Sequence, residues 1–123
     1  MARVIAARTN WSRALQSDLE ARVLAEIRRQ GLPEPEIQYT LELRGGGRIR
    51  FDFAWSLRRV GLEVDHPFWH AGEGQSHRDK RRDRLVAAQN WRTVRLASLD
   101  VTTGLAEAIT EVASILGLDV PCA

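Results

Sequence analysis

The chain has 123 residues, the length of one ordinary domain, and is 44% hydrophobic and 28% charged. This balance excludes a chain that is disordered throughout, and no apolar run approaches the roughly 18 residues of a membrane helix. The formal net charge of +2 excludes a polycationic tail. We therefore expect one domain over 1–123 and no membrane association.

The first residues and the single cysteine bear on where the protein works. Arg3, Arg8 and Arg13 interrupt the N-terminal stretch, so it lacks the continuous apolar core of a signal peptide. One cysteine, Cys122, excludes an internal disulfide and a multi-cysteine zinc site. We expect a cytoplasmic protein without zinc, in which residues 1–16 are a loosely ordered lead-in.

The first predicted element is a helix that begins at Ser17. Ser17 and Glu20 have the spacing of a capping box, and Gly31 and Pro33 end the helix. Its apolar face carries Leu19, Val23, Leu24 and Ile27. Glu20 falls within this face, so it is either the capping partner of Ser17 or a carboxylate directed at the core. The second arrangement is costly unless the carboxylate is paired or bound to a metal.

Three strands are predicted next. Apolar and polar residues alternate over 37–43, and three glycines at 45–47 favour a tight turn. The second strand, 48–55, places Asp52 on one face, and residues 60–65 form the third strand. The opposite face of the second strand carries Ile49, Phe51, Phe53 and Trp55.

The rest of the chain predicts two helices and one more strand. We expect a loop over 67–75, a basic helix over 76–90, a strand over 91–96 and an amphipathic helix over 104–116. The expected order is α-β-β-β-α-β-α. This order predicts an α/β fold with a small central mixed sheet of about four strands flanked by helices. Its core spans 17–101, and a C-terminal helical segment spans 102–120.

Basic residues are concentrated in the predicted basic helix and the strand after it. Between Ser76 and Arg95, seven basic residues accompany two acids. Such an excess suits a polyanionic partner, although a solvated helix face accounts for it equally well.

Three acids in neighbouring strands are the strongest chemical signal. Glu63 and Asp65 share a face because side chains alternate along a strand, and Asp52 joins them if the connection between the strands has an even number of residues. Carboxylates at such short distances repel one another unless a cation or a proton lies among them. Their hard oxygens suit Mg²⁺ or Mn²⁺. The alternative is a set of surface acids paired with Arg48, Arg50 and Arg59.

A histidine follows these acids on a glycine-containing loop. At this position His70 is a candidate general acid or base, although a lone histidine is more often structural.

Four segments, taken together in chain order, form a further pattern. They are 52–53 (Asp-Phe), 64–70 (Val-Asp-His-Pro-Phe-Trp-His), 78–83 (Arg-Asp-Lys-Arg-Arg-Asp) and 91–95 (Trp-Arg-Thr-Val-Arg). Together they resemble the PD-(D/E)XK nucleases and, more narrowly, small domains related to the very-short-patch repair endonuclease. The resemblance covers about residues 17–101. It implies a restriction-endonuclease-like fold and a metal-dependent endonuclease acting on DNA, in repair or defence.

The resemblance also implies roles for single residues. Asp52 and Glu63 match the acids that bind Mg²⁺ (or Mn²⁺), with the carbonyl of Val64 as a further ligand. Glu20 matches an acid that organises metal-bound water, and His70 matches a catalytic histidine.

This chain departs from the family pattern in two places. Asp65 stands where most of the family has a lysine and the repair endonucleases have a histidine, and it is a candidate metal ligand or water-positioning residue. The charge-stabilising role of the lysine is therefore open to His70, Arg82 or a second metal. Pro67 stands where the first cysteine of the repair enzyme's zinc site would be.

Nucleic acid is the partner that these patterns predict. The residues expected to contact phosphates are Arg78, Arg81, Arg82 and Arg95. Arg78 and Arg82 lie on the inner stripe of the basic helix, and Arg82 is alternatively a salt-bridge partner of Asp79 or Glu63. DNA is the expected substrate and RNA stays open. A second hypothesis is a regulatory, nucleic-acid-binding module of a toxin–antitoxin type that does not cleave, and a third is a toxin or defence nuclease acting on RNA.

Overall fold

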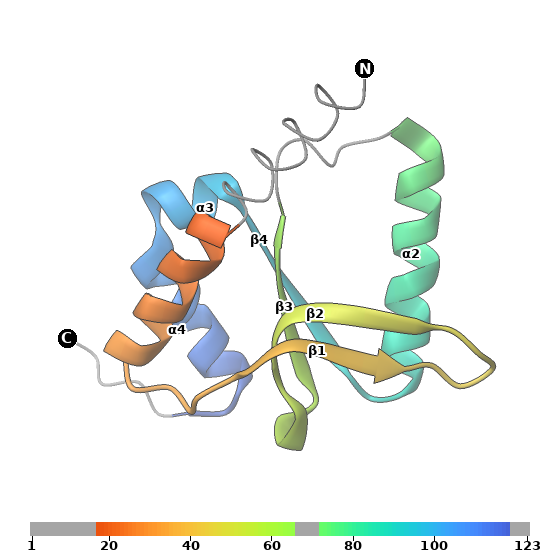
Figure 1. Cartoon of the computed structure of the whole chain (residues 1–123), viewed down its shortest axis with the longest axis horizontal. Coiled ribbons are helices and arrows are strands. Elements are labelled where there is room, and N and C mark those ends of the chain that lie inside the picture. The colour runs from red at the N-terminus through yellow and green to blue at the C-terminus, as the bar shows by residue number, and fades with distance from the viewer. Residues whose placement is uncertain (1–16, 66–71, 119–123) are drawn as a thin grey trace, which may run out of the picture.

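A four-stranded mixed sheet lies at the centre of the computed structural model, which describes residues 17–65 and 72–118 (Figure 1). The strands are β1 (Glu36–Glu42), β2 (Arg48–Trp55), β3 (Val60–Asp65) and β4 (Arg92–Ala97). They lie in the order β1-β2-β3-β4. The first two pairings are antiparallel, and β3 and β4 are parallel. This architecture confirms the predicted α/β fold.

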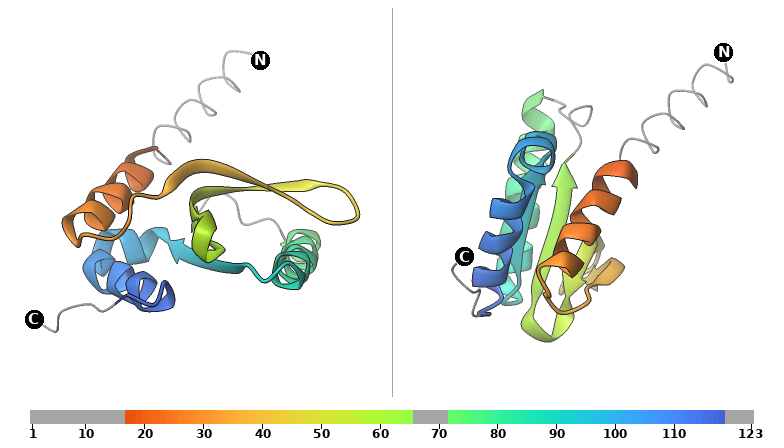
Figure 2. Two further views of the ribbon diagram at one scale, coloured as in Figure 1. Left: turned by 90° about the horizontal axis from the view of Figure 1, so that it is seen from below. Right: turned by 90° about the vertical axis from the view of Figure 1, so that its left-hand side faces the viewer.

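Helices cover both faces of β3 and β4. A helix over 17–29, here called the N-terminal helix, shares one core with α4 (Leu105–Ile115), and α2 (Gly72–Ala88) packs in the other core (Figure 1). In Figure 2 (right), the N-terminal helix and α2 lie on opposite sides of β3. The parallel β3–β4 pair requires a crossover, and the segment that contains α2 supplies it. The observed order is the predicted one with an additional helix, α3 (Ser98–Thr103). No helix in the described ranges is both long and apolar enough to cross a membrane.

One predicted boundary is wrong, and one short helix was not predicted. Helix α2 begins at Gly72, so the expected loop over 67–75 fails for its last four residues. Gly72 and Gly74 disfavour a helix locally, and tertiary context overrides this weak preference. The single C-terminal helix expected over 104–116 is preceded by α3, in which the Asp100 carboxylate accepts a hydrogen bond from the Ala97 N–H (2.8 Å) at the helix start. Gly104 then separates α3 from α4.

The apolar residues form two cores, one on each side of the sheet. The larger core joins the N-terminal helix and α4 to one face of the sheet and contains Phe53, Trp55 and Leu62. The smaller core contains Phe51, Val86 and Trp91. The expectation that Ile49, Phe51, Phe53 and Trp55 share one face is therefore wrong.

A change of direction within the β1–β2 hairpin explains this division. β2 pairs with β3 only over Phe53–Trp55, and Gln38, which lies across from Asp52, has a positive φ of 55°. Strict alternation is interrupted there, and the rest of the hairpin extends away from β3 (Figure 1). We call this extension, residues 39–51, the hairpin arm.

The hairpin arm packs against α2 and the residues that follow it. The Trp91 ring stacks with Tyr39 and Phe51 at centroid distances of 5.4 and 5.7 Å. At the tip, the Gln89 side chain accepts a hydrogen bond from the Arg44 N–H (2.8 Å) and donates one to the carbonyl of Glu42 (3.0 Å). These contacts fix the arm relative to the end of α2.

Candidate functional site

Acidic side chains meet where β2 diverges from β3. Trp55 pairs with Val60, so residues 56–59 connect the strands, and this even number agrees with the condition set for Asp52 to approach Glu63. The ladder ends at the Phe53–Leu62 pair. Beyond it, the Val64 N–H donates to Asp52 Oδ2 at 2.8 Å, so the carboxylate takes the place of a strand partner.

Burial, together with two neighbouring carboxylates, raises the pKa of Asp52 above its usual value. Burial raises its pKa to about 7, against the opposing effect of the Val64 hydrogen bond. The charge of Glu20, a hydrogen bond with Glu20 and the charge of Glu63 also contribute to this raised pKa. Near neutral pH, a proton therefore resides on Asp52 for much of the time. The three acids Glu20, Asp52 and Glu63 are here called the carboxylate cluster.

Glu20 reaches the cluster from the N-terminal helix. Leu19, Val23 and Ile27 of this helix are buried against the sheet, and this packing directs the neighbouring Glu20 toward Asp52. Of the two interpretations of Glu20, its contact with Asp52 supports the carboxylate directed inward.

Glu63 is the centre of an ion-pair network between β3, β4 and α2. Its Oε1 contacts the Arg82 guanidinium, and its Oε2 lies 3.3 Å from Arg95 Nε. Arg95 also pairs with Asp83 at 2.7 Å. The Glu63 side chain is only 12% exposed, so two guanidinium groups compensate a largely desolvated carboxylate. The alternative pairing of Glu63 with Arg48, Arg50 or Arg59 is not the arrangement seen, and the part played by Asp83 was not foreseen from the sequence.

The arginines of α2 differ in their surroundings. Arg82 is partly buried, with its guanidinium carbon 5.9 Å from the centre of the Phe51 ring. Arg78 and Arg81 are exposed. Arg78, which the helix pattern places on the same inner stripe as Arg82, is thus more exposed than Arg82.

The structure says less about the other predicted site residues, Asp65, Val64 and His70. Asp65 ends β3 and is exposed, and Val64 is buried and contributes its N–H to Asp52. The metal-ligand roles predicted for Asp65 and for the Val64 carbonyl stay predictions. His70 lies outside the described residues.

The donors present suit a magnesium ion that is completed by water and substrate. Over 17–65 and 72–118, no group of three or more His, Cys, Asp or Glu side chains is arranged to hold a metal ion. Mg²⁺ is, however, commonly bound through one or two carboxylates together with waters and substrate phosphates. Glu20 and Asp52 are two such carboxylates in contact, and the raised pKa of Asp52 indicates a site that a cation would stabilise.

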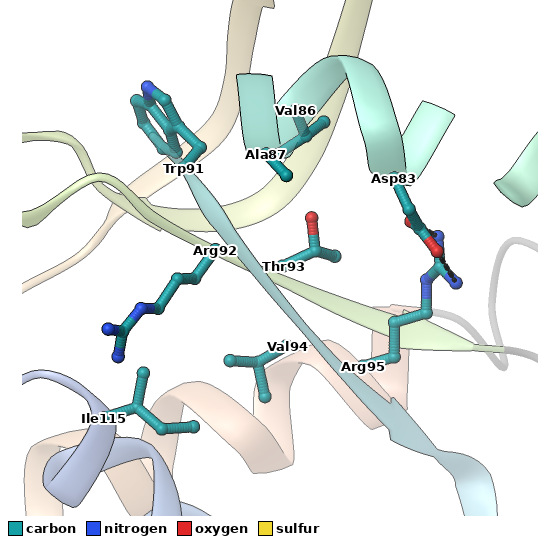
Figure 3. Close-up of a pocket in the computed structure, with 9 residues that line it drawn as sticks. All are labelled: Asp83, Val86, Ala87, Trp91, Arg92, Thr93, Val94, Arg95 and Ile115. Atoms are coloured by element: carbon teal, nitrogen blue, oxygen red, sulfur yellow. Dashed lines mark hydrogen bonds and ion pairs between the residues drawn. The ribbon is translucent and has the colours of Figure 1, made fainter. Parts of the chain in front are cut away.

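A cavity of about 590 Å³ opens at the outer edge of β4, between α2 and α4 (Figure 3). Its apolar lining includes Val86, Val94 and Ile115. Asp83 and Arg95 at its rim point toward one another in Figure 3. The cavity therefore adjoins the ion-pair network and is distinct from the contact between Glu20 and Asp52.

Comparison with known proteins yields two relatives and no assigned function. No known protein family and no solved structure matches the chain. Two Mycobacterium tuberculosis proteins, the uncharacterized proteins Rv2248 and MT2308, are 35% identical over 86 residues, which is 70% of this chain. The chain spans about a third of their length, since the match covers 32% of each.

Proposed function

We propose that this protein is a metal-dependent endonuclease that hydrolyses phosphodiester bonds in DNA. The observation that supports this most is the convergence of Glu20, Asp52 and Glu63 from three separate elements onto one largely buried place. Grouping like charges there costs stability, which is typical of sites that serve function rather than folding. The sequence resemblance to PD-(D/E)XK nucleases names the same three residues.

Each residue of the cluster has a part in this proposal. Asp52 and Glu63 are the pair predicted to bind the metal, but two arginines engage Glu63, so Glu20 would join Asp52 in holding the divalent ion. The ion would lower the pKa of a bound water and offset charge on the phosphate. Asp52 would release its proton on binding such an ion, because a cation stabilises the ionised carboxylate. Arg82 and Arg95 fix the orientation of Glu63 and neutralise it. Arg82 thereby places a positive charge beside the cluster, in a chain that has Asp65 where the family has lysine.

Nicking of supercoiled plasmid DNA tests the proposal. We expect cleavage with Mg²⁺ or Mn²⁺, none with a chelator, and none for Asp52→Asn prepared in the same way. The matched control is Glu107→Gln, which removes an acid on the exposed part of α4 and should cleave like the wild type. Metal-dependent cleavage that persists in Asp52→Asn, or no cleavage by the wild type, would overturn the proposal.

A second candidate is a nucleic-acid-binding module that does not cleave. It is favoured by the engagement of Glu63 by two arginines and by the aspartate at position 65. Metal-independent binding of a DNA duplex without nicking would support this candidate over the first. Cleavage of RNA but not of DNA would instead indicate the third hypothesis, a nuclease acting on RNA.

A further inference from the structure

The hairpin arm has one face that packs and one face that does not. Tyr39 and Phe51 stack on Trp91, and Leu41 is buried in the same core. Because side chains alternate along a strand, Arg48 and Arg50 lie on the opposite face of the arm, away from α2. We call this the outer face.

The outer face and the tip are positively charged. Arg44, Arg48 and Arg50 are all exposed, and no ion pair involves them within the described part of the chain. The acid within the arm is Glu42, across from Arg48 in the register, so residues 39–51 carry a formal charge of +2. This surface is separate from the basic helix.

The outer face leads directly to the carboxylate cluster. β2 runs from Arg48 and Arg50 into Asp52, which Glu20 meets from the N-terminal helix. In Figure 2 (left), the arm and the N-terminal helix lie on the side of the molecule away from α2. The strand that carries Arg48 and Arg50 therefore continues directly into the residue that contacts Glu20.

We propose that the outer face of the hairpin arm binds the phosphate backbone of DNA beside the carboxylate cluster. The proposal rests on the proposed nuclease function, which would need substrate on this side. Arg48 and Arg50 are about 7 Å apart along the strand, a spacing that lets each guanidinium contact a different phosphate.

Two properties of the arm favour a polyanion over a protein partner. None of the exposed large apolar side chains of the described residues lies in 39–51, so the arm offers little apolar surface for a protein interface. The hydrogen bonds of Gln89 and the stacking on Trp91 hold the arm in place before binding, which lowers the entropy cost of association.

The experiment compares two double variants in DNA binding. Arg48→Gln/Arg50→Gln removes two charges from the outer face, and the control Arg28→Gln/Arg29→Gln removes two charges from the N-terminal helix, where both arginines are exposed. Binding of a labelled duplex of about 30 base pairs is measured in chelator at several salt concentrations, with unfolding curves to show that both variants fold.

We expect the arm variant to bind about tenfold more weakly at moderate salt, with a slope of log affinity against log salt reduced by about two. The control should keep the wild-type slope. Equal affinities and slopes for the arm variant and the wild type, or no duplex binding by the wild type, would overturn the arm proposal. An effect of the arm variant on an RNA duplex but not on DNA would also overturn it.

Plasmid nicking, scored on the same preparations, separates the two proposals. If the wild type cleaves and the arm variant binds the duplex as the wild type does, the nuclease proposal stands and the proposal of DNA binding by the arm is rejected. Arm-dependent binding without any cleavage supports the arm surface and rejects the nuclease.

Discussion

Asp52 connects the chemistry of the cluster to the stability of the fold. Its carboxylate accepts the Val64 N–H and lies beside Glu20 and Glu63, and its pKa is raised to about 7. The unfolded chain has no such surroundings, so there the same group ionises near 3.8. Between these values, the folded protein retains a proton that the unfolded chain has released.

Stability should therefore fall as pH rises through 7 in metal-free protein. A raised pKa stabilises the folded state below the unfolded value, and this contribution is lost as pH approaches the folded value. We expect the free energy of unfolding of the wild type, relative to Asp52→Asn, to be about 1–2 kcal/mol lower at pH 8 than at pH 5. This is less than the roughly 3 kcal/mol that the two pKa values give for a fully buried group, because solvent partly screens the Asp52 carboxylate. Urea unfolding of both proteins at the two pH values, in chelator, measures this difference. A difference that does not change with pH would show that Asp52 is ionised in the folded state.

Arg82 and Arg81 are neighbours in sequence with different expected effects on stability. Arg82→Ala removes one of the two guanidinium groups that pair with the largely buried Glu63 and leaves the other, Arg95. We expect the free energy of unfolding to fall by about 1–2 kcal/mol. Arg81→Ala removes an exposed side chain and should change stability by less than about 0.5 kcal/mol. Urea unfolding of the two variants checks the assignment, which is wrong if Arg81→Ala is the more destabilising.

At the scale of the elements, the change of direction in β2 organises the site. The β2–β3 ladder ends at the Phe53–Leu62 pair, so the Val64 N–H lies beyond this ladder and donates to the Asp52 carboxylate instead. Beyond this point the hairpin arm extends toward α2. Phe51 then packs flat on Gly61, where a Cβ atom would lie 2.4 Å from the ring. A glycine at this position is therefore required by packing, since its φ is not in the left-handed region.

Gly61→Ala should destabilise the protein by about 1–3 kcal/mol through overpacking against the buried Phe51 ring. Gly104→Ala is the matched control, because a Cβ atom there would meet open space and φ is −151°. We expect the control to change stability by less than about 0.5 kcal/mol. Thermal or urea unfolding distinguishes the two, and equal effects would contradict the close packing of Phe51 on Gly61.

At the scale of the whole molecule, the carboxylate cluster joins separate elements. Glu20 lies on the N-terminal helix, Asp52 on β2 and Glu63 on β3, and Glu63 is in turn held by α2 and β4. A ligand that binds here would bridge these elements in the folded state and would have no site in the unfolded chain.

Divalent cations should therefore raise the melting temperature. Binding only to the folded state stabilises it by mass action, by about 1.4 kcal/mol when the metal concentration is ten times its Kd. Millimolar Mg²⁺ or Mn²⁺ should produce a measurable shift for the wild type and little or none for Asp52→Asn. The absence of a shift in the wild type, together with no heat of binding by calorimetry in the presence of DNA, would reject the metal site.

The sequence by itself determined the fold class, the order of the elements apart from α3, and the candidate residues of the site. Alternation placed Glu63 and Asp65 on one face of β3, and the spacing of apolar residues located the N-terminal helix, because both signals are local and strong. Only the tertiary structure decided how these elements meet. The division of Phe51 from Phe53 follows from the change of direction at Asp52, beyond which β2 no longer pairs with β3. The contact of Glu20 with Asp52 follows from helix packing. The partners of Glu63 come from α2 and β4, since contacts between residues far apart in the chain depend on how its segments pack.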